Sequence, residues 1–360
     1  MPKTTTALQT PLREQLDRLA LFERCDSPVL SLYLDLSTDQ HGRRDHAAGL
    51  LKKVFAERGA SLEGDARTSF DADVERIRAY IESDVPASVS GLAIFASSGA
   101  DGFFEAVQLD APIGEPALFV GDVPHLYPLA RLNDQYPRYA ALVLDTNSAR
   151  LFVFGLGRIE AREEVTNEKT RRGAAGGWAQ KRYQRHVENV HLHHMKEVVT
   201  VLERVMREES IDTLVLACDE VARPILMEQL PKHLAAKVID TVSLDIKAPE
   251  HEVLAQTMAA LRQHDGVTDA ERVQALRDEC GARGLGVAGP EATLDALTKQ
   301  QVEELLLTAR AEDLRSKEPE QFSGQLVALA QQNSARIRFI ENSNLLADVG
   351  GVGALLRFRI

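Results

Sequence analysis

The sequence predicts an α/β protein made of three consecutive α/β domains, and three observations lead to this prediction. The chain has 360 residues, which is more than one domain usually holds. Apolar runs of strand length alternate with segments of helical periodicity along the whole chain. The composition, with 44% hydrophobic and 27% charged residues, is typical of globular proteins. We expect the domains to cover residues 1–135, 136–248 and 249–360.

The first domain is expected to form a small α/β sandwich. Three of its apolar runs are bounded by turn residues and predict strands, at 29–36, 91–97 and 103–109. Two segments have the apolar spacing of helices, at 47–58 and 72–81, with a loop at 59–68 between them. Prolines within the segment 124–137 indicate a linker to the next domain.

The middle domain is predicted to begin with a β-hairpin. Two apolar runs flank a turn-forming tetrapeptide, with the runs at 139–144 and 151–154 and the turn at 145–148. A helix, a buried strand and a second helix follow, at 187–207, 211–217 and 221–230. We expect the domain to close near 242–246. Antiparallel strands followed by strand–helix alternation predict a mixed sheet.

The third domain is expected to follow two helices, at 251–263 and 269–280. Helix and strand patterns then alternate at 293–298, 302–307, 322–331 and 336–339. The chain ends in a glycine turn at Gly350 and Gly351, which leads into a terminal strand. This alternation predicts another α/β domain.

The segment 168–186 is basic, although the chain carries a formal net charge of −12. Glu168 is its only acidic residue. Glycines allow the backbone to approach a partner closely, and clustered cations neutralise phosphates. We therefore predict a loop that binds structured RNA through Arg171, Arg172, Gly176, Gly177, Trp178, Lys181, Arg182 and Arg185. The alternative is a basic loop that is merely solvated.

Trp178 is the only tryptophan and follows the paired glycines. One interpretation is a buried aromatic residue that anchors the segment to its own domain. The glycine and basic neighbours favour the other interpretation, in which the indole stacks on an RNA base.

Composition also excludes several classes of protein. Cys25, Cys218 and Cys280 form no CxxC pair, which excludes a zinc ribbon and fits a reducing cytoplasm. No apolar run approaches the length of a membrane span, and we expect a cytoplasmic protein without a membrane partner. The acidic balance argues against binding of duplex nucleic acid over a whole face.

Motifs in the order expected of one family run along nearly the whole chain. They are VLSLYLDL, GLAIFAS, ALVLDTNSARLFVF, the paired glycines, RYQRHVE, IDTLVLACDE, ATLDALTKQQVEELLL and GGVGALLRF. This set resembles the bacterial branch of the archaeo-eukaryotic peptide-chain release factor and Pelota family, including Balon-like ribosome factors. The resemblance implies a ribonuclease-H-like middle domain and a last domain that is an α/β/α sandwich like the release-factor C-terminal domain.

The resemblance also implies a function at the ribosome. It predicts a factor that occupies the A site in ribosome hibernation or rescue, with the basic glycine segment directed to the peptidyl-transferase centre. The implied partners are the ribosome, through ribosomal RNA and peptidyl-tRNA, and a translational GTPase such as elongation factor Tu, which the last domain would contact.

Two departures from the family bear on activity. Release factors carry Gly-Gly-Gln, whereas this chain has Gly176-Gly177-Trp178, with Gln180 two positions late. Ester hydrolysis depends on donors placed to within about an ångström. The segment 60–65 is acidic where the family carries its stop-codon signature, so codon reading is not expected. The alternatives are a peptidyl-tRNA hydrolase with Gln180 as the catalytic residue and a cytoplasmic scaffold that binds no RNA.

Other patterns are interpreted as structural. His186, His191, His193 and His194 lack a Cys or carboxylate that would complete a metal site, and partial protonation next to RNA is favoured instead. The glycines of 284–289 match GxGxxG but follow a helix rather than a strand, so no dinucleotide site is expected. Asp145 is interpreted as a turn former rather than a nuclease ligand. We expect neither a metal nor a cofactor.

Overall fold

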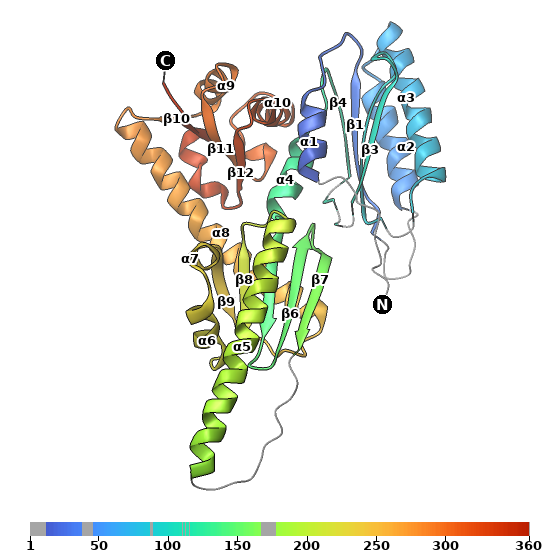
Figure 1. Cartoon of the computed structure of the whole chain (residues 1–360). Coiled ribbons are helices and arrows are strands. Elements are labelled where there is room, and N and C mark those ends of the chain that lie inside the picture. Colours follow the sequence, from blue (N-terminus) through green and yellow to red (C-terminus); the bar gives the residue numbers. More distant parts are fainter. Residues whose placement is uncertain are drawn as a thin grey trace. The chain divides into compact units, whose positions relative to one another are not determined.

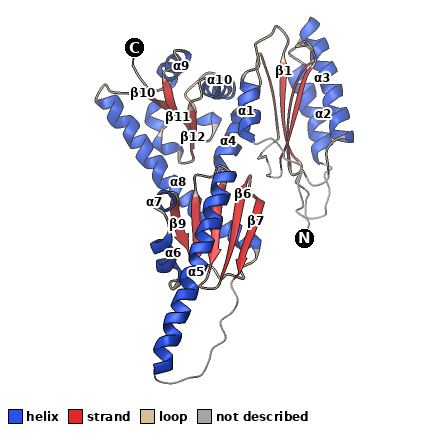
Figure 2. Cartoon of the chain, in the orientation of Figure 1, coloured by secondary structure: helices blue, strands red, loops and turns tan. Residues whose placement is uncertain are grey.

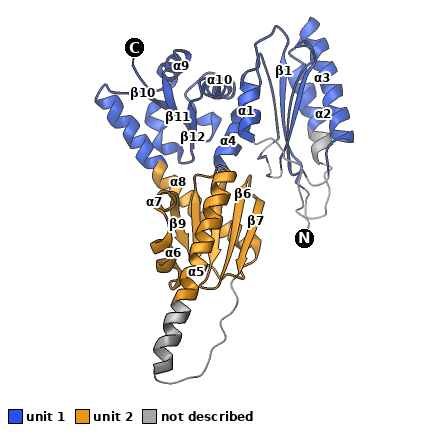
Figure 3. Cartoon of the chain, in the orientation of Figure 1, with its two compact units in different colours: residues 1–135, 269–360 blue, residues 136–268 orange. Residues whose placement is uncertain are grey.

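The computed structural model of this chain describes residues 12–37, 46–86, 89–109, 111, 113–114, 116–166 and 178–359 (Figure 1), with only the backbone described at 46–50 and 178–188. The chain divides into two compact units (Figure 3). One unit combines Met1–Gln135 with Asp269–Ile360, and the other is Tyr136–Thr268. The described strands form three sheets with helices packed on them (Figure 2), which confirms a mixed α/β protein. The three predicted domain boundaries stay a prediction.

The first sheet is antiparallel, with strand order β3-β2-β1-β4. Its strands are β1 (Val29–Asp35), β2 (Gly91–Ser97), β3 (Phe103–Leu109) and β4 (Ala117–Gly121). The three predicted strands are confirmed, whereas β4 was not predicted. Helices α2 (His46–Gly59) and α3 (Gly64–Ser83) cover one face, where Phe70 and Ile77 share a buried cluster with Leu32 and Ile94. The expected loop at 59–68 is shorter than predicted because α3 already begins at Gly64.

The prediction of a linker at 124–137 is wrong. Helix α4 (Tyr127–Gln135) occupies it, with Tyr127, Leu129 and Leu132 buried. Pro128 is compatible with this helix because it lies in the first turn, where backbone N–H groups have no acceptor within the helix. Helix α1 (Leu12–Ala20), which was not predicted either, buries Leu16 and Leu19.

The second sheet is mixed, as predicted, with strand order β7-β6-β5-β8-β9. Its strands are β5 (Tyr139–Leu144), β6 (Ser148–Gly155), β7 (Arg158–Thr166), β8 (Leu214–Cys218) and β9 (Val238–Val242). The first three strands pair antiparallel, and β5, β8 and β9 pair parallel. The predicted hairpin is confirmed, with Leu142 opposite Leu151.

Helices cover both faces of this sheet. Helix α5 (Trp178–Glu208) packs Met195 and Leu202 in one cluster with Leu142, Leu151 and Leu226; the last of these belongs to α6 (Ala222–Gln229). The short helix α7 (Lys232–Ala235) adds Leu234 to this cluster. On the other face, Val253 and Leu261 of α8 (Glu250–Gly281) pack against Tyr139 and Phe152.

The third sheet has strand order β10-β13-β11-β12, in which only β11 and β12 are paired parallel among the described strands. Its strands are β10 (Gly286–Ala288), β11 (Val302–Thr308), β12 (Arg336–Ile340) and β13 (Val352–Leu356). Its helices are α9 (Pro290–Thr298) and α10 (Pro319–Gln332), with 3-10 turns at Ala311–Asp313, Ser343–Leu345 and Ala347–Val349. The predicted glycine turn is confirmed, since Gly350 and Gly351 have φ of 78° and 86°.

The two helices predicted at 251–263 and 269–280 are one continuous helix, α8. Gly266 lies inside it and does not end it, because a single glycine costs only about 1 kcal/mol in a helix. Val273 and Leu276, near the end of α8, pack on Leu306 of β11 and Ile340 of β12. Within the described part of the chain, no helix combines the length and the apolarity that a membrane crossing requires.

Candidate functional site: the first turns of helix α5

The predicted site divides at residue 178. Trp178 is the first residue of α5, and Gln180, Lys181, Arg182 and Arg185 lie in its first turns. Arg171, Arg172, Gly176 and Gly177 lie outside the described residues. The prediction of a loop over 168–186 is therefore wrong from residue 178 onward. The reason is local, since 178–208 contains neither glycine nor proline and begins with good helix formers such as Ala, Gln, Lys and Arg.

Helical spacing groups the site residues in a way that a loop would not. Positions 178, 181, 182 and 185 are separated by three, four and seven residues, so they lie on the same side of the helix. Gln180 is two residues from Trp178, which places it about 200° around the helix axis. The backbone therefore puts the basic positions and Trp178 together and puts Gln180 on the other side.

The charge at this end of α5 is unusual for a helix. Its first turn contains no acidic residue, whereas Lys181, Arg182 and Arg185 follow within two turns. The N-terminus of a helix carries a partial positive charge, so cations there are unfavourable and anions are favourable. A bound phosphate would compensate both the basic residues and the unpaired N–H groups of the first turn.

The second half of α5 is firmly held by its own domain. Met195, Val198 and Leu202 are at most 1% exposed and belong to the core cluster beneath the sheet. Arg204 pairs with Glu163 of β7 at 3.0 Å. Because the helix is continuous, this anchored half fixes the direction of the backbone that carries the basic positions.

The histidines of α5 have different environments. His194 is fully buried, and neither of its ring nitrogens has a hydrogen-bond partner in the described structure. Burial lowers the pKa of His194, so the imidazole is neutral and the expected partial protonation does not apply to it. His193 is exposed and His191 is half-buried. Where side chains are described, no group of three or more His, Cys, Asp or Glu could hold a metal.

Two aspartates follow the parallel strands β5 and β8, and both accept hydrogen bonds from backbone N–H groups. Asp145 Oδ1 accepts hydrogen bonds from the N–H groups of Asn147 and Ser148, each at 2.7 Å. Its interpretation as a turn former is confirmed. Asp219 Oδ1 accepts from Val221 and Ala222 at 3.1 and 2.6 Å and so caps the start of α6.

The GxGxxG match at 284–289 contains strand β10 and the turn that leads into α9. Gly289 has φ of 94° and precedes Pro290, the first residue of α9. A Cβ at Gly286 would lie 3.0 Å from the Cys280 nitrogen and the Leu276 carbonyl oxygen, so α8 approaches this strand too closely for a side chain. Glycine is therefore explained at these two positions by backbone geometry alone.

A family model matches the middle of the chain. Residues 124–262 match the model of bacterial archaeo-eukaryotic release factor family 10. This match covers α4, the second sheet and the start of α8, and it confirms the resemblance to the bacterial branch of the release factor family. The comparison with curated proteins found no match.

This chain also matches solved structures at low sequence identity. Archaeal translation termination factor aRF1 is 15% identical, with 96% of this chain and 97% of that chain covered and a TM-score of 0.28. Dom34 of S. cerevisiae, described as a termination-like factor interacting with Hbs1, is 12% identical over 75% of this chain and 80% of its own, with a TM-score of 0.45. A ribosome-bound archaeal Pelota, from a structure with ABCE1, is 16% identical over 98% of this chain and 96% of its own, with a TM-score of 0.44.

Proposed function

We propose that this protein is a cytoplasmic ribosome-binding translation factor of the release factor and Pelota family. It occupies the A site in ribosome hibernation or rescue, and the segment 168–186 is directed to the peptidyl-transferase centre. The observation that carries the proposal is the basic side of α5, which starts directly after Gly176-Gly177 and holds positions 178, 181, 182 and 185 on one side of a helix. The family match over residues 124–262 supports the same assignment.

The chemistry of ribosomal RNA fits this end of the helix. RNA presents phosphates to cations and helix N-termini, and unpaired bases to aromatic rings. The chain is acidic as a whole, so RNA would bind at the local basic element and not over the rest of the surface.

The finer features of the fold extend the proposal. The strand order β7-β6-β5-β8-β9, with an antiparallel meander followed by parallel strands, supports a ribonuclease-H-like middle domain. The third sheet, with the end of α8 packed on Leu306 and Ile340, supports an α/β/α sandwich like the release-factor C-terminal domain. That domain would contact a translational GTPase such as elongation factor Tu.

Peptidyl-tRNA hydrolysis through Gln180 remains the second candidate. It is favoured only by the glutamine lying close to the paired glycines. The helix places Gln180 away from the basic side of α5, and this argues for a factor that binds and blocks the site without cleaving the ester.

Co-sedimentation with purified ribosomes at graded salt, followed by a peptidyl-tRNA release assay, tests the proposal. We expect binding that weakens steeply with salt, and no release of peptide. Absence of ribosome binding at low salt would refute the assignment. Release of peptide by the wild-type protein would favour the hydrolase.

A further inference from the structure

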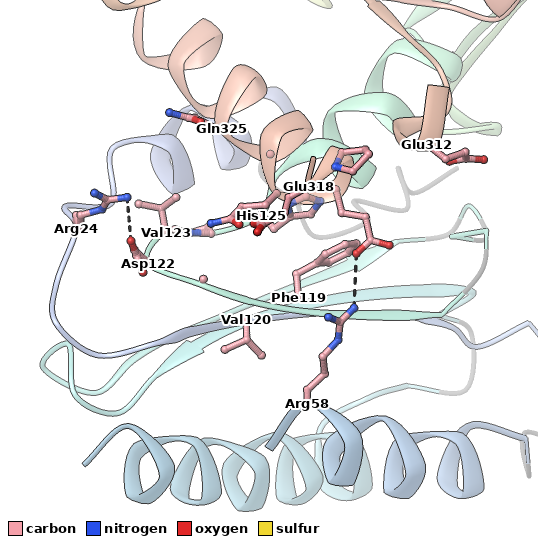
Figure 4. A pocket seen from close by; sticks show the side chains of 16 residues that line it. Arg24, Arg58, Phe119, Val120, Asp122, Val123, His125, Glu312, Glu318 and Gln325 are labelled. Atoms are coloured by element: carbon pink, nitrogen blue, oxygen red, sulfur yellow. Dashed lines mark ion pairs between the residues drawn. The ribbon is translucent and has the colours of Figure 1, made fainter. Parts of the chain in front are cut away.

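A pocket of about 580 Å³ opens in the unit that combines residues 1–135 and 269–360 (Figure 4). Strand β4 and the segment that follows it form one wall, with Phe119 and His125. The start of α10 and the segment before it form another, with Glu312, Glu318 and Gly324. The volume is that of a small-molecule site.

His125 is the buried polar group of this pocket, and it is only 8% exposed. Its ring stacks on Phe119, with the ring centroids 3.7 Å apart. The side of α10 faces it through Gly324, where an added Cβ would lie 2.2 Å from Nδ1. The described residues offer no hydrogen bond to either ring nitrogen, so the imidazole is held in place by packing while its hydrogen-bonding capacity is unused.

The backbone of His125 is also fixed. Its N–H donates to Ser31 Oγ at 2.9 Å, and its carbonyl oxygen accepts from the Tyr33 hydroxyl at 2.5 Å. Burial lowers the pKa of His125 to about 3, so the imidazole stays neutral in the cell. A neutral imidazole has one nitrogen that accepts a hydrogen bond and one that donates.

The charges around the pocket are unbalanced. It is lined by four carboxylates and two guanidinium groups, which leaves two negative charges uncompensated. Arg24 pairs with Asp122 at 2.8 Å and Arg58 pairs with Glu320 at 3.6 Å (Figure 4). Glu312 and Glu318 are exposed at the rim, and neither forms an ion pair with a described residue.

We propose that this pocket binds a small organic amine. The ammonium group is held by Glu318 and the free imidazole nitrogen of His125, and its apolar stem lies against Phe119 and Pro319. An ammonium donates N–H hydrogen bonds, and the carboxylate and the neutral imidazole nitrogen can each accept one. An anion would be repelled by the carboxylates of the rim, and an uncharged ligand would leave Glu318 unpaired. The same chemistry is presented by a free diamine and by a lysine side chain of another protein.

Isothermal titration calorimetry on the full chain tests this proposal, with putrescine and N-acetyl-lysine amide as the two probes. Tighter binding of putrescine identifies a free diamine as the ligand, and tighter binding of the lysine derivative identifies a side chain. Absence of binding by both probes, or preferential binding of inorganic phosphate, overturns the proposal.

Two charge-removing variants test whether Glu318 contributes to amine binding. Glu318→Gln should weaken binding about threefold to tenfold, because it removes an exposed charge-assisted contact. Glu291→Gln removes the same charge from an exposed position on α9 outside the pocket, and it should leave the affinity within about twofold because charges that do not contact the ligand are largely screened. Equal weakening by the two variants would show non-specific attraction and would contradict the site.

His125→Phe provides the complementary test. It keeps the stack on Phe119 but removes the nitrogen acceptor, so amine binding should weaken while the circular-dichroism spectrum stays that of the wild type. If His125→Phe unfolds the protein, the Glu318→Gln and Glu291→Gln pair still decides the outcome. None of these measurements involves the ribosome, so amine binding is tested independently of the proposed function.

Discussion

The Tyr127 hydroxyl donates a hydrogen bond of 2.8 Å to the Thr308 carbonyl oxygen, and it thereby joins α4 to the end of β11 across 181 residues of sequence. The Tyr127 ring meets Phe339 edge to face, with the centroids 5.2 Å apart. The Phe339 N–H in turn donates to Asp134 at 3.0 Å. Helix α4 is therefore part of the core that the last ninety or so residues build.

Tyr127→Phe should loosen this junction. It removes one buried hydrogen bond, and we expect a loss of about 1–2 kcal/mol in the local opening free energy. Hydrogen–deuterium exchange of the amides in α4 and β12 measures this. Tyr136→Phe is the control, because no hydrogen bond of its hydroxyl is found in the described structure. Equal protection of α4 in wild type and Tyr127→Phe would contradict the role of the bond.

Two glycine-to-alanine variants should have opposite effects. Gly324→Ala drives a methyl group into the His125 ring, and overpacking of this kind costs about 1–3 kcal/mol. Gly266→Ala, inside α8, meets no atom within 4 Å and should stabilise by about 0.5–1 kcal/mol. Urea denaturation measures both. A stabilised Gly324→Ala would mean that α10 does not approach His125 closely enough to exclude a methyl group.

His194→Leu should remove part of the acid sensitivity of the protein. Burial lowers the pKa of His194 below its unfolded value of 6.5, so the unfolded chain binds the proton more tightly. Stability is therefore lost as the pH falls through that unfolded value. The Ser148 backbone, Glu197 and Asp145 oppose this shift and His191 adds to it, without reversing the direction. Unfolding free energies of wild type and variant should diverge between about pH 7 and pH 5 in favour of the variant; parallel curves would contradict this.

Removing two charges from the start of α5 should weaken ribosome binding. If Lys181 and Arg182 both contact phosphates, Lys181→Gln with Arg182→Gln should lower the log–log salt slope by about 2. The matched control is Lys196→Gln with Arg207→Gln, two exposed cations farther along the same helix. Indistinguishable slopes for the two pairs would remove the basic side of α5 from the interface.

Two further substitutions separate blocking from hydrolysis. For a factor that blocks the site, Trp178→Ala should reduce ribosome occupancy through lost stacking of about 1–3 kcal/mol, and Gln180→Ala should have no effect. For a hydrolase, Gln180→Ala should abolish release of peptide from peptidyl-tRNA at unchanged affinity. A release assay run beside a pelleting assay on both variants decides between them, and release lost in Gln180→Ala would overturn the blocking model.

Much of the fold could be predicted from short-range patterns in the sequence. The apolar run of β1, the turn at Asp145 and the glycines at 350 and 351 are short-range patterns, and each predicted the element found. Helix α4 was missed because Pro128 and the prolines on either side of the helix indicate a linker, while its contacts with Thr308 and Phe339 come from far away in sequence. Helix α5 begins earlier than predicted. The paired glycines indicate a loop, and the prediction extended that loop over the whole basic segment.

The pocket around His125 could not be predicted from the sequence, because its residues are far apart in the chain. Phe119, His125 and Gly324 meet only in the folded chain, and His125 stands alone in sequence without a recognisable motif. By contrast, the basic cluster at 171–185 is contiguous, so the amino-acid sequence alone reveals its charge. The start of the helix at Trp178, within this cluster, could be recognised only from the backbone structure.

Strand β7 has a consequence for how this protein behaves at high concentration. It lies at the end of the order β7-β6-β5-β8-β9, so one side of its backbone has no neighbouring strand among those described. Exposed strand edges invite pairing with another chain, and charged side chains oppose it. Glu160, Arg162 and Glu164 alternate along β7, and a second copy docking there would have to desolvate these charges. The middle domain thus carries its own protection against aggregation by strand addition.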